Sequence, residues 1–176
     1  MNHTREITMP SLTLPSRDAP LHEHLRAHAR RTPDKPAYLW YGAALTFAEL
    51  DRASDAFAAR LAALGVRKGE PVALFMNNCP QYIMAHYGIQ KLGAIVCPCG
   101  PLNKEHELEY QLSDLQARVI VAADTLLPVV DKVRAQTALQ HVFAVRYEDM
   151  LPDQPALTVP PDLLALKAKP CEWPAG

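Results

Sequence analysis

The sequence predicts a doubly wound α/β fold, in which helices flank a mostly parallel sheet and a small hairpin lies near the amino terminus. Residues 72–76 and 119–123 are apolar at every position rather than at every second one, so both faces of these strands must be covered. Segments with helical periodicity separate the predicted strands, which excludes tight hairpins between them. We therefore expect parallel strands joined by right-handed crossover helices on both faces of the sheet.

The amino-terminal part is predicted to contain an arm, a short helix and the hairpin. Residues 1–20 mix Thr, Ser and Pro without periodicity, and we interpret them as an arm whose order depends on what it packs against. A helix is predicted over 21–31, because Leu21, Leu25 and Ala29 form one stripe and two prolines follow. The aromatic-rich run that begins at residue 37, with Gly42 as its turn, predicts the hairpin.

The α/β part is predicted to begin with a well-defined helix. Thr46 and Glu49 have the spacing of a capping box, and Gly65 provides a left-handed stop after Leu64. The elements that follow alternate between strand and helix. We predict strands at 72–76, 94–99, 119–123 and 142–147, and helices at 80–92, 104–115 and 126–139.

Residues 151–176 are predicted to be a proline-rich connector. Six of the 16 prolines fall there and the periodic pattern stops, so we expect no strand or helix in this segment. The expected organisation is an arm at 1–20, an α/β unit at 21–150, and a connector at 151–176 that leads to a missing remainder.

Composition excludes several classes of protein. The chain is 49% hydrophobic with a net charge of −1, which fits a globular domain and excludes a broad basic surface for nucleic acid. No apolar run approaches the length of about 20 residues that spans a bilayer, so we expect no integral membrane segment and a cytoplasmic location. The cysteines lack paired spacing, so we expect free thiols and no metal site. They are Cys79, Cys97, Cys99 and Cys171.

The sequence contains no recognisable phosphate loop. Neither GxGxxG nor GxxxxGK[ST] occurs at a strand-to-helix junction, and only Gly100 would let a backbone approach a ligand closely. The junctions at 77–80 and 124–125 carry no glycine. We interpret Asn78 and Asn103 as helix-start residues rather than ligand contacts.

No catalytic residue is predicted either. None of the serines lies in a G-x-S-x-G elbow. His86 and His106 fall within predicted helices and are interpreted as packing or surface residues. His24 and His28 lie four residues apart and could face one metal ion, but no third ligand is evident, so we assign them to a polar helix face.

The order of the segments resembles the amino-terminal part of adenylate-forming enzymes, especially fatty acyl-CoA synthetases. The first similar motif is Leu45-Thr46-Phe47-Ala48-Glu49-Leu50, followed by an Ala-rich helix that ends in Leu64-Gly65-Val66-Arg67-Lys68-Gly69-Glu70. The second is Gln90-Lys91-Leu92-Gly93-Ala94-Ile95-Val96-Cys97-Pro98. The resemblance covers about residues 21–147 and implies the first subdomain of the large domain of an acyl-CoA synthetase.

The resemblance implies that the whole enzyme is a fatty acid–CoA ligase. Such an enzyme uses ATP and Mg²⁺ to form an acyl-AMP and transfers the acyl group to CoA. It also implies that Gly100, Pro101 and Leu102 lie beside the channel for the CoA nucleotide. The family's phosphate loop, T-S-G-T-T-G-x-P-K-G, is absent from these 176 residues. We therefore expect this chain alone to be structural and inactive and to bind none of these cofactors.

Two alternative functions remain open at the level of sequence. The chain could be a stand-alone dimerisation or binding module of the same fold, since an unfinished sheet edge invites pairing. It could also be a flavodoxin-like or dinucleotide-binding domain, although the missing glycine fingerprint argues against this. If the chain is part of a synthetase, as the resemblance implies, its partner is the remainder of that enzyme, with the phosphate-loop subdomain and the carboxyl-terminal domain. The resemblance implies an acid pocket built mainly from residues beyond Gly176, so these residues do not predict the acyl chain length.

Overall fold

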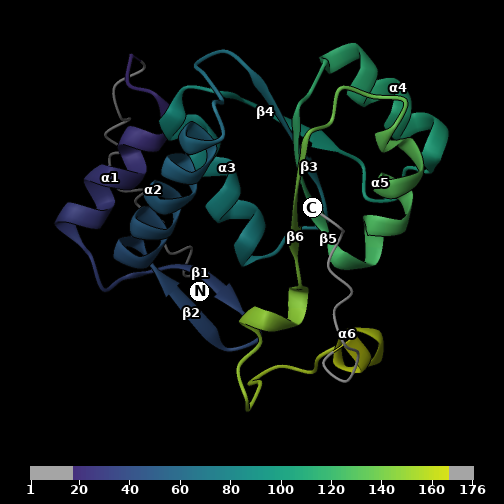
Figure 1. Ribbon diagram of the computed structural model, residues 1–176. Helices are drawn as coiled ribbons and strands as arrows, with labels where there is room; N and C mark the ends of the chain where they lie inside the picture. The colour runs from purple at the N-terminus through teal and green to yellow at the C-terminus, as the bar shows by residue number, and fades with distance from the viewer. Residues whose placement is uncertain (1–17, 167–176) are drawn as a thin grey trace, which may run out of the picture.

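Four parallel strands form the centre of the molecule (Figure 1). Their order in the sheet is β4-β3-β5-β6. The computed structural model describes residues 18–166, so most of the predicted arm and the end of the predicted connector lie outside the described residues. Val72 of β3 pairs with Val96 of β4 on one side and with Val119 of β5 on the other. The strand bounds are Pro71–Phe75 for β3, Ile95–Cys99 for β4, Val119–Ala123 for β5 and His141–Val145 for β6.

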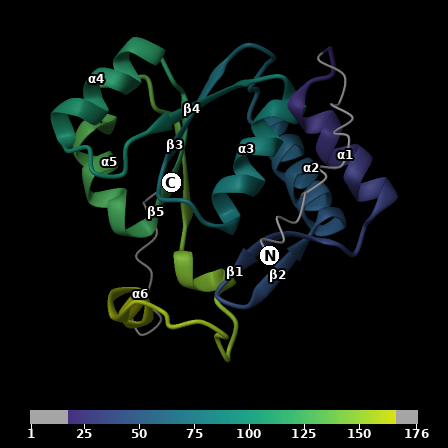
Figure 2. The ribbon, with the colours of Figure 1, turned by 180° about the vertical axis from the view of Figure 1, so that it is seen from behind.

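Helices cover both faces of this sheet, as Figures 1 and 2 show from opposite sides. Helices α2 (Phe47–Ala63) and α3 (Pro80–Leu92) lie on one face, and α4 (Glu105–Leu115) and α5 (Leu127–Arg134) lie on the other. Alternate residues of each strand enter two separate apolar clusters, one on the α2 and α3 side and one on the α4 and α5 side. The predicted doubly wound α/β fold is confirmed.

The amino-terminal elements also follow the prediction. Helix α1 spans Leu21–Arg31, and β1 (Pro36–Trp40) pairs antiparallel with β2 (Ala43–Thr46). Gly42 has a φ of 101° in the turn, a conformation that side-chain-bearing residues rarely adopt. A small third cluster, centred on buried Leu25, Leu45 and Leu50, joins α1, the hairpin and α2.

The helix starts are partly as predicted. Thr46 and Glu49 form the capping box of α2, with the Glu49 amide donating to Thr46 Oγ1 at 3.2 Å and the Thr46 amide donating to Glu49 Oε2 at 2.9 Å. The interpretation of Asn78 and Asn103 as helix-start residues is wrong, because the residues at those cap positions are Cys79 and Lys104. The Cys79 thiol takes the role expected of an asparagine by accepting a bond from the Tyr82 amide at 3.4 Å.

The last predicted helix and strand both end earlier than expected. The helix predicted to reach residue 139 ends at Arg134, because the Thr137 amide and hydroxyl both bond back to the Arg134 carbonyl. The last strand ends at Val145, and a 3₁₀ helix, η2 (Tyr147–Met150), follows. Another 3₁₀ turn, η1 (Asp124–Leu126), leads from β5 into α5.

The expectation that no helix follows residue 150 is wrong. Residues Pro161–Leu166 form helix α6, and its Leu163 and Leu166 pack against the cluster on the α2 and α3 side. Leu151 and Val159 are buried as well. The described part of the predicted connector therefore packs on the sheet domain, while the boundary at residue 150 stays a prediction. Within residues 18–166, no helix has the length and apolar character needed to cross a membrane.

Candidate functional site

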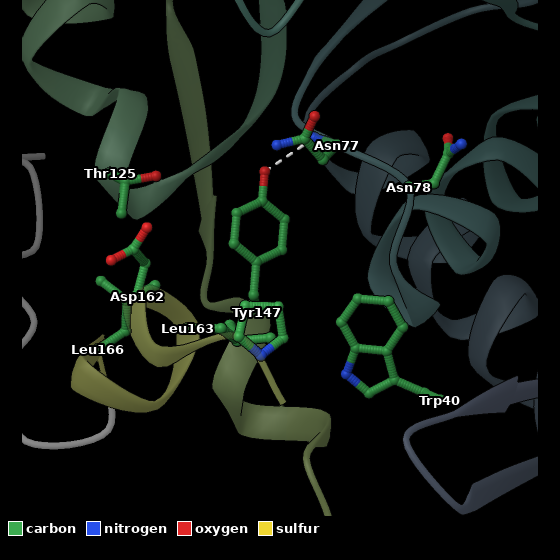
Figure 3. A pocket seen from close by; sticks show the side chains of 9 residues that line it. Trp40, Asn77, Asn78, Thr125, Tyr147, Asp162, Leu163 and Leu166 are labelled. Atoms are coloured by element: carbon green, nitrogen blue, oxygen red, sulfur yellow. Dashed lines mark hydrogen bonds between the residues drawn. The ribbon is translucent and has the colours of Figure 1, made fainter. Parts of the chain in front are cut away.

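A pocket of about 350 Å³ opens at the carboxyl ends of the parallel strands (Figure 3). Segments far apart in the sequence contribute to it: the end of β1, the loop after β3, the turns after β5 and β6, and α6. The volume lies within the range of small-molecule sites, about 300–1,000 Å³. The lining residues are Trp40, Asn77, Asn78, Thr125, Tyr147, Pro160, Asp162, Leu163 and Leu166.

The strand order explains why a hollow forms here. Strands β3 and β5 are neighbours, but the chain leaves β3 toward α3 on one face and leaves β5 toward α5 on the other. The two loops therefore diverge, and this topological switch point is where open α/β sheets bind ligands. Asn77 comes from the first loop and Thr125 from the second.

Tyr147 fixes the geometry of the pocket. Its hydroxyl accepts a hydrogen bond of 2.8 Å from the Asn77 backbone amide, which ties the turn after β6 to the loop after β3 (Figure 3). The Gln81 side-chain amide strengthens the same junction by donating to the Arg146 carbonyl at 2.6 Å. Burial raises the pKa of the Tyr147 phenol, so it stays neutral and acts as a structural hydrogen-bonding group.

Trp40 supplies an unused donor. Its indole Nε1 is buried and has no hydrogen-bond partner among the described residues, and in Figure 3 the nitrogen lies on the side of the ring turned toward Tyr147. A buried donor without a partner costs about 1–3 kcal/mol. The pocket combines apolar walls with polar side chains from Asn77, Asn78, Thr125 and Asp162.

The charges around the pocket do not suit an anion. None of the nine described residues that line it is Lys, Arg or His, and Asp162 brings a carboxylate. Arg146 is not among the lining residues, and its guanidinium donates to the Leu166 carbonyl of α6 at 3.3 Å. Its guanidinium pairs with buried Glu148 and approaches Asp124 Oδ2 at 3.8 Å. Its charge is thus matched by carboxylates, and the arrangement favours an uncharged, largely apolar group in the pocket.

The residues predicted to lie beside a CoA channel occupy a different place. The loop after β4, one of the two edge strands of the sheet, contains Gly100, Pro101 and Leu102. None of these residues lines the pocket. A Cβ on Gly100 would lie 2.8 Å from Asn103 Oδ1. The glycine therefore leaves room for the Asn103 side chain, which donates to Gln111 at 2.9 Å. Leu102 is 87% exposed, and the proposed role of the loop stays a prediction.

Of the histidines singled out from the sequence, His86 and His28 pack against aromatic rings, His24 is half-buried and His106 is exposed. The ring of His86 lies beside Tyr82 and Tyr87, its Nε2 is 2.9 Å from Gln90 Nε2, and burial lowers its pKa. His28 stacks on Phe47 with ring centroids 4.9 Å apart. Across residues 18–166, no group of three or more His, Cys, Asp or Glu side chains is arranged to hold a metal ion.

The described cysteines are free and buried. Burial raises the pKa of all three thiols, that of Cys99 to about 11. A raised pKa keeps a thiol protonated and unreactive at neutral pH, so these residues act as small apolar side chains. They are Cys79, Cys97 and Cys99, while Cys171 lies outside the described residues.

A family model described as "AMP-binding enzyme" matches residues 25–172, most of the chain. The chain belongs to the AMP-binding enzyme family. Among curated members, a long-chain-fatty-acid–CoA ligase of Bacillus subtilis (strain 168) is 38% identical over 147 residues, covering 84% of this chain and 25% of the relative. A ligase of the same name from Salmonella typhimurium is 39% identical over 144 residues, covering 81% and 26%. The chain thus spans about a quarter of these AMP-binding relatives.

Solved structures of AMP-binding enzymes share the fold. A fatty acyl CoA synthetase from Mycobacterium tuberculosis matches with a TM-score of 0.66 and 28% identity, over 73% of this chain and 27% of that one. A long-chain-fatty-acid-CoA ligase from Archaeoglobus fulgidus matches with a TM-score of 0.67 and 27% identity, over 80% and 29%. The family resemblance inferred from the motifs is confirmed.

Sequence reasoning missed most of the pocket. The loops that carry Asn77 and Thr125 contain no phosphate-binding glycines, and no local pattern marks Trp40, Tyr147 or the α6 residues as a site. The available signal is the rule that ligands bind at a switch point. Applying this rule requires the strand order, which periodicity does not reveal.

Proposed function

We propose that this chain is the amino-terminal part of a long-chain-fatty-acid–CoA ligase. In the whole enzyme, the acid carboxylate attacks the α-phosphate of ATP, giving acyl-AMP and pyrophosphate. The CoA thiolate then attacks the acyl carbon and releases AMP. The observation that carries the proposal is the 38–39% identity, over more than four fifths of the chain, to ligases of which it spans about a quarter.

The role proposed for this part is framework rather than reaction chemistry. Attack on ATP requires positive charge and backbone amides arranged around phosphate oxygens. The 176 residues lack the family's glycine-rich phosphate loop, and the described pocket offers a carboxylate and no cationic side chain. The residues present therefore do not fit Mg²⁺-ATP, and we assign ATP, Mg²⁺ and CoA to the whole enzyme, which we place in the cytoplasm.

Two features support placing this part of the chain close to the reaction site of the whole enzyme. The pocket and the loop with Gly100, Pro101 and Leu102 both follow the carboxyl ends of parallel strands, and so lie at the same edge of the sheet. Exposed Leu102 leaves that loop free to contact another part of the enzyme. We propose that the loop borders the CoA channel, as the family resemblance implies.

A chimera tests the proposal. Residues 25–172 of this chain would replace the aligned segment of the Bacillus subtilis ligase, and palmitoyl-CoA formation would be measured with ATP and Mg²⁺. We expect activity within about tenfold of the parent ligase, since the loop and pocket residues supply little transition-state stabilisation. A parent ligase without the segment is the control and should be inactive. A folded chimera with no more activity than this control would refute the proposal.

A further inference from the structure

We infer that helix α6 and the proline before it form a lid, which opens and closes the pocket at the carboxyl ends of the strands. Four of the nine residues that line the pocket belong to this lid, residues 160–166 (Figure 3). They are Pro160, Asp162, Leu163 and Leu166. The inference goes beyond the proposed function, because it concerns access to the pocket and holds whichever reaction the whole enzyme performs.

The lid is only loosely packed on the rest of the molecule. None of the residues of α6 is buried, and Leu164 is 47% exposed. A helix of six residues is too short to be stable without contacts to other parts of a protein. Here those contacts come from Leu163 and Leu166, which pack against the apolar cluster on the α2 and α3 side. The closed position therefore depends on a small number of side chains.

The segment that leads to the lid allows it to move. Residues 153, 154 and 156–158 are exposed. In the described part of the chain, the backbone of residues 152–160 has one hydrogen bond to an earlier element, from the Ala156 amide to the Tyr41 carbonyl at 2.9 Å. Val159 is buried and anchors the segment just before the lid. Opening of the lid beyond Val159 thus requires no change in the sheet or the hairpin, as is typical of local opening.

Arg146 is the latch that holds the lid closed. Its guanidinium donates to the Leu166 carbonyl at 3.3 Å, and a cationic side chain in this position stabilises the last carbonyls of a helix. Glu148, whose side chain is 3% exposed, pairs with the same guanidinium, and Asp124 Oδ2 lies 3.8 Å from Arg146 Nε. These carboxylates keep the guanidinium in place when α6 moves away, so the latch stays ready to bind the lid again.

The latch is directly connected to the pocket. The Arg146 carbonyl accepts a bond from the Gln81 side chain at 2.6 Å, and the hydroxyl of the next residue, Tyr147, accepts one from the Asn77 amide at 2.8 Å. One short segment therefore contacts both the lid and the loop after β3. An uncharged, largely apolar group in the pocket would contact the lid leucines only in the closed state, so its binding would shift the lid toward closure.

Native-state hydrogen exchange of the 176-residue chain tests the movement. We expect the α6 amides to exchange at least about 100-fold faster than the Ile120 and Val121 amides of β5, because α6 opens while the sheet stays folded. Leu163→Ser should speed α6 exchange by about tenfold or more without changing exchange in β5. The matched control is Leu164→Ser, on the exposed side of the same helix, which should change α6 exchange by less than about threefold. Exchange of the α6 amides only together with those of β5 would overturn the inference.

The fluorescence of Trp40 tests whether the movement opens the pocket. Trp173→Phe leaves Trp40 as the one tryptophan of the chain. The buried indole Nε1 of Trp40 lies on the side of the ring turned toward Tyr147 and α6 (Figure 3), so opening should let water and the uncharged quencher acrylamide reach it. We expect Leu163→Ser to raise the acrylamide quenching constant by about twofold or more and Leu164→Ser to leave it unchanged. Equal quenching in these two variants would contradict a lid.

A second pair of variants tests the latch. Arg146→Met combined with Glu148→Gln removes the guanidinium without leaving a buried carboxylate unpaired. We expect this double variant to speed α6 exchange by about tenfold or more. Glu148→Gln alone keeps the bond from Arg146 to the Leu166 carbonyl and should change the rate by less than about threefold. Unchanged β5 exchange in both variants shows that the sheet is intact, and equal α6 rates in the two would refute the role of Arg146.

Discussion

Lys91 is the most deeply buried charged side chain among the ion pairs of the described residues. Its ammonium group, 1% exposed, contacts Asp51 Oδ1 at 2.5 Å, Asp55 Oδ1 at 2.9 Å and the Asp51 carbonyl at 2.7 Å. Arg26 extends the network from α1 by contacting Asp55 at 3.4 Å. The network therefore joins α1, α2 and α3, and a buried ammonium that lost its partners would be costly.

We predict that Lys91→Met destabilises the protein by about 2 kcal/mol. Breaking a buried pair typically costs 3–5 kcal/mol, but here the partners left behind, Asp51 and Asp55, are 24% and 52% exposed and can be hydrated. Urea unfolding measures the change. The control is Lys132→Met, which breaks the exposed pair with Glu105 and should cost less than about 1 kcal/mol. Equal losses in the two variants would contradict this account.

The same network predicts a pH dependence. Burial alone would raise the pKa of Asp55, but the hydrogen bond and charge of Lys91, with those of Arg26, outweigh it and lower the pKa. A lowered folded-state pKa adds stability above the unfolded value, about 3.9, and this contribution is lost as the pH falls through the folded value. The stability difference between wild type and Lys91→Met should thus be constant from about pH 5 to 8 and shrink below about pH 4.

Urea unfolding at several pH values checks this prediction. Asp55→Asn in both backgrounds is the control, and it should weaken the pH dependence because the titrating carboxyl is gone. A difference between wild type and Lys91→Met that grew as the pH fell would show that the Asp55 pKa is not lowered by Lys91.

At the scale of elements, the start of α2 depends on local side chains. The capping box of Thr46 and Glu49 satisfies amides that would otherwise lack partners at the helix end. We predict that Thr46→Ala costs about 1 kcal/mol in thermal or urea unfolding, while Thr46→Ser costs less than about 0.5 kcal/mol because serine keeps the acceptor oxygen. If the serine variant were as unstable as the alanine variant, the Thr46 methyl group rather than its hydroxyl would be responsible.

Elements defined by local signals were predictable, and elements defined by distant contacts were not. The capping box located α2, and proline followed by a terminal glycine located α3. Helix α6 has only six residues and begins at Pro161. It is held by leucines that pack on the core and by the bond from Arg146 to the Leu166 carbonyl. None of these contacts is visible in the local sequence, so the sequence alone predicts a connector for this segment.

At the scale of the whole molecule, the sequence predicts the layers but not the strand order. Uniformly apolar strands such as 119–123 require cover on both faces, and the structure shows it. The pocket depends on β3 and β5 being neighbours, which brings Asn77 close to Thr125. Periodicity contains no information on that pairing, so the candidate site could be assembled only from the fold.

At the same scale, the fold does not by itself determine the chemistry. Doubly wound sheets host many unrelated reactions, and the chemistry resides in the loops. Here the loop after β3 carries asparagines and a buried thiol where a phosphate-binding domain would carry glycines. The described pocket thus contains one carboxylate, that of Asp162, and no cationic side chain.

Pyrophosphate release by the isolated 176-residue chain tests the central claim most directly. The chain would be incubated with ATP, Mg²⁺ and palmitate, with the Bacillus subtilis ligase as the active control. We predict release no faster than from a heat-inactivated sample, because the sequence contains no glycine-rich phosphate loop and the described pocket has no cationic side chain. Palmitate-dependent release above that background would contradict the claim.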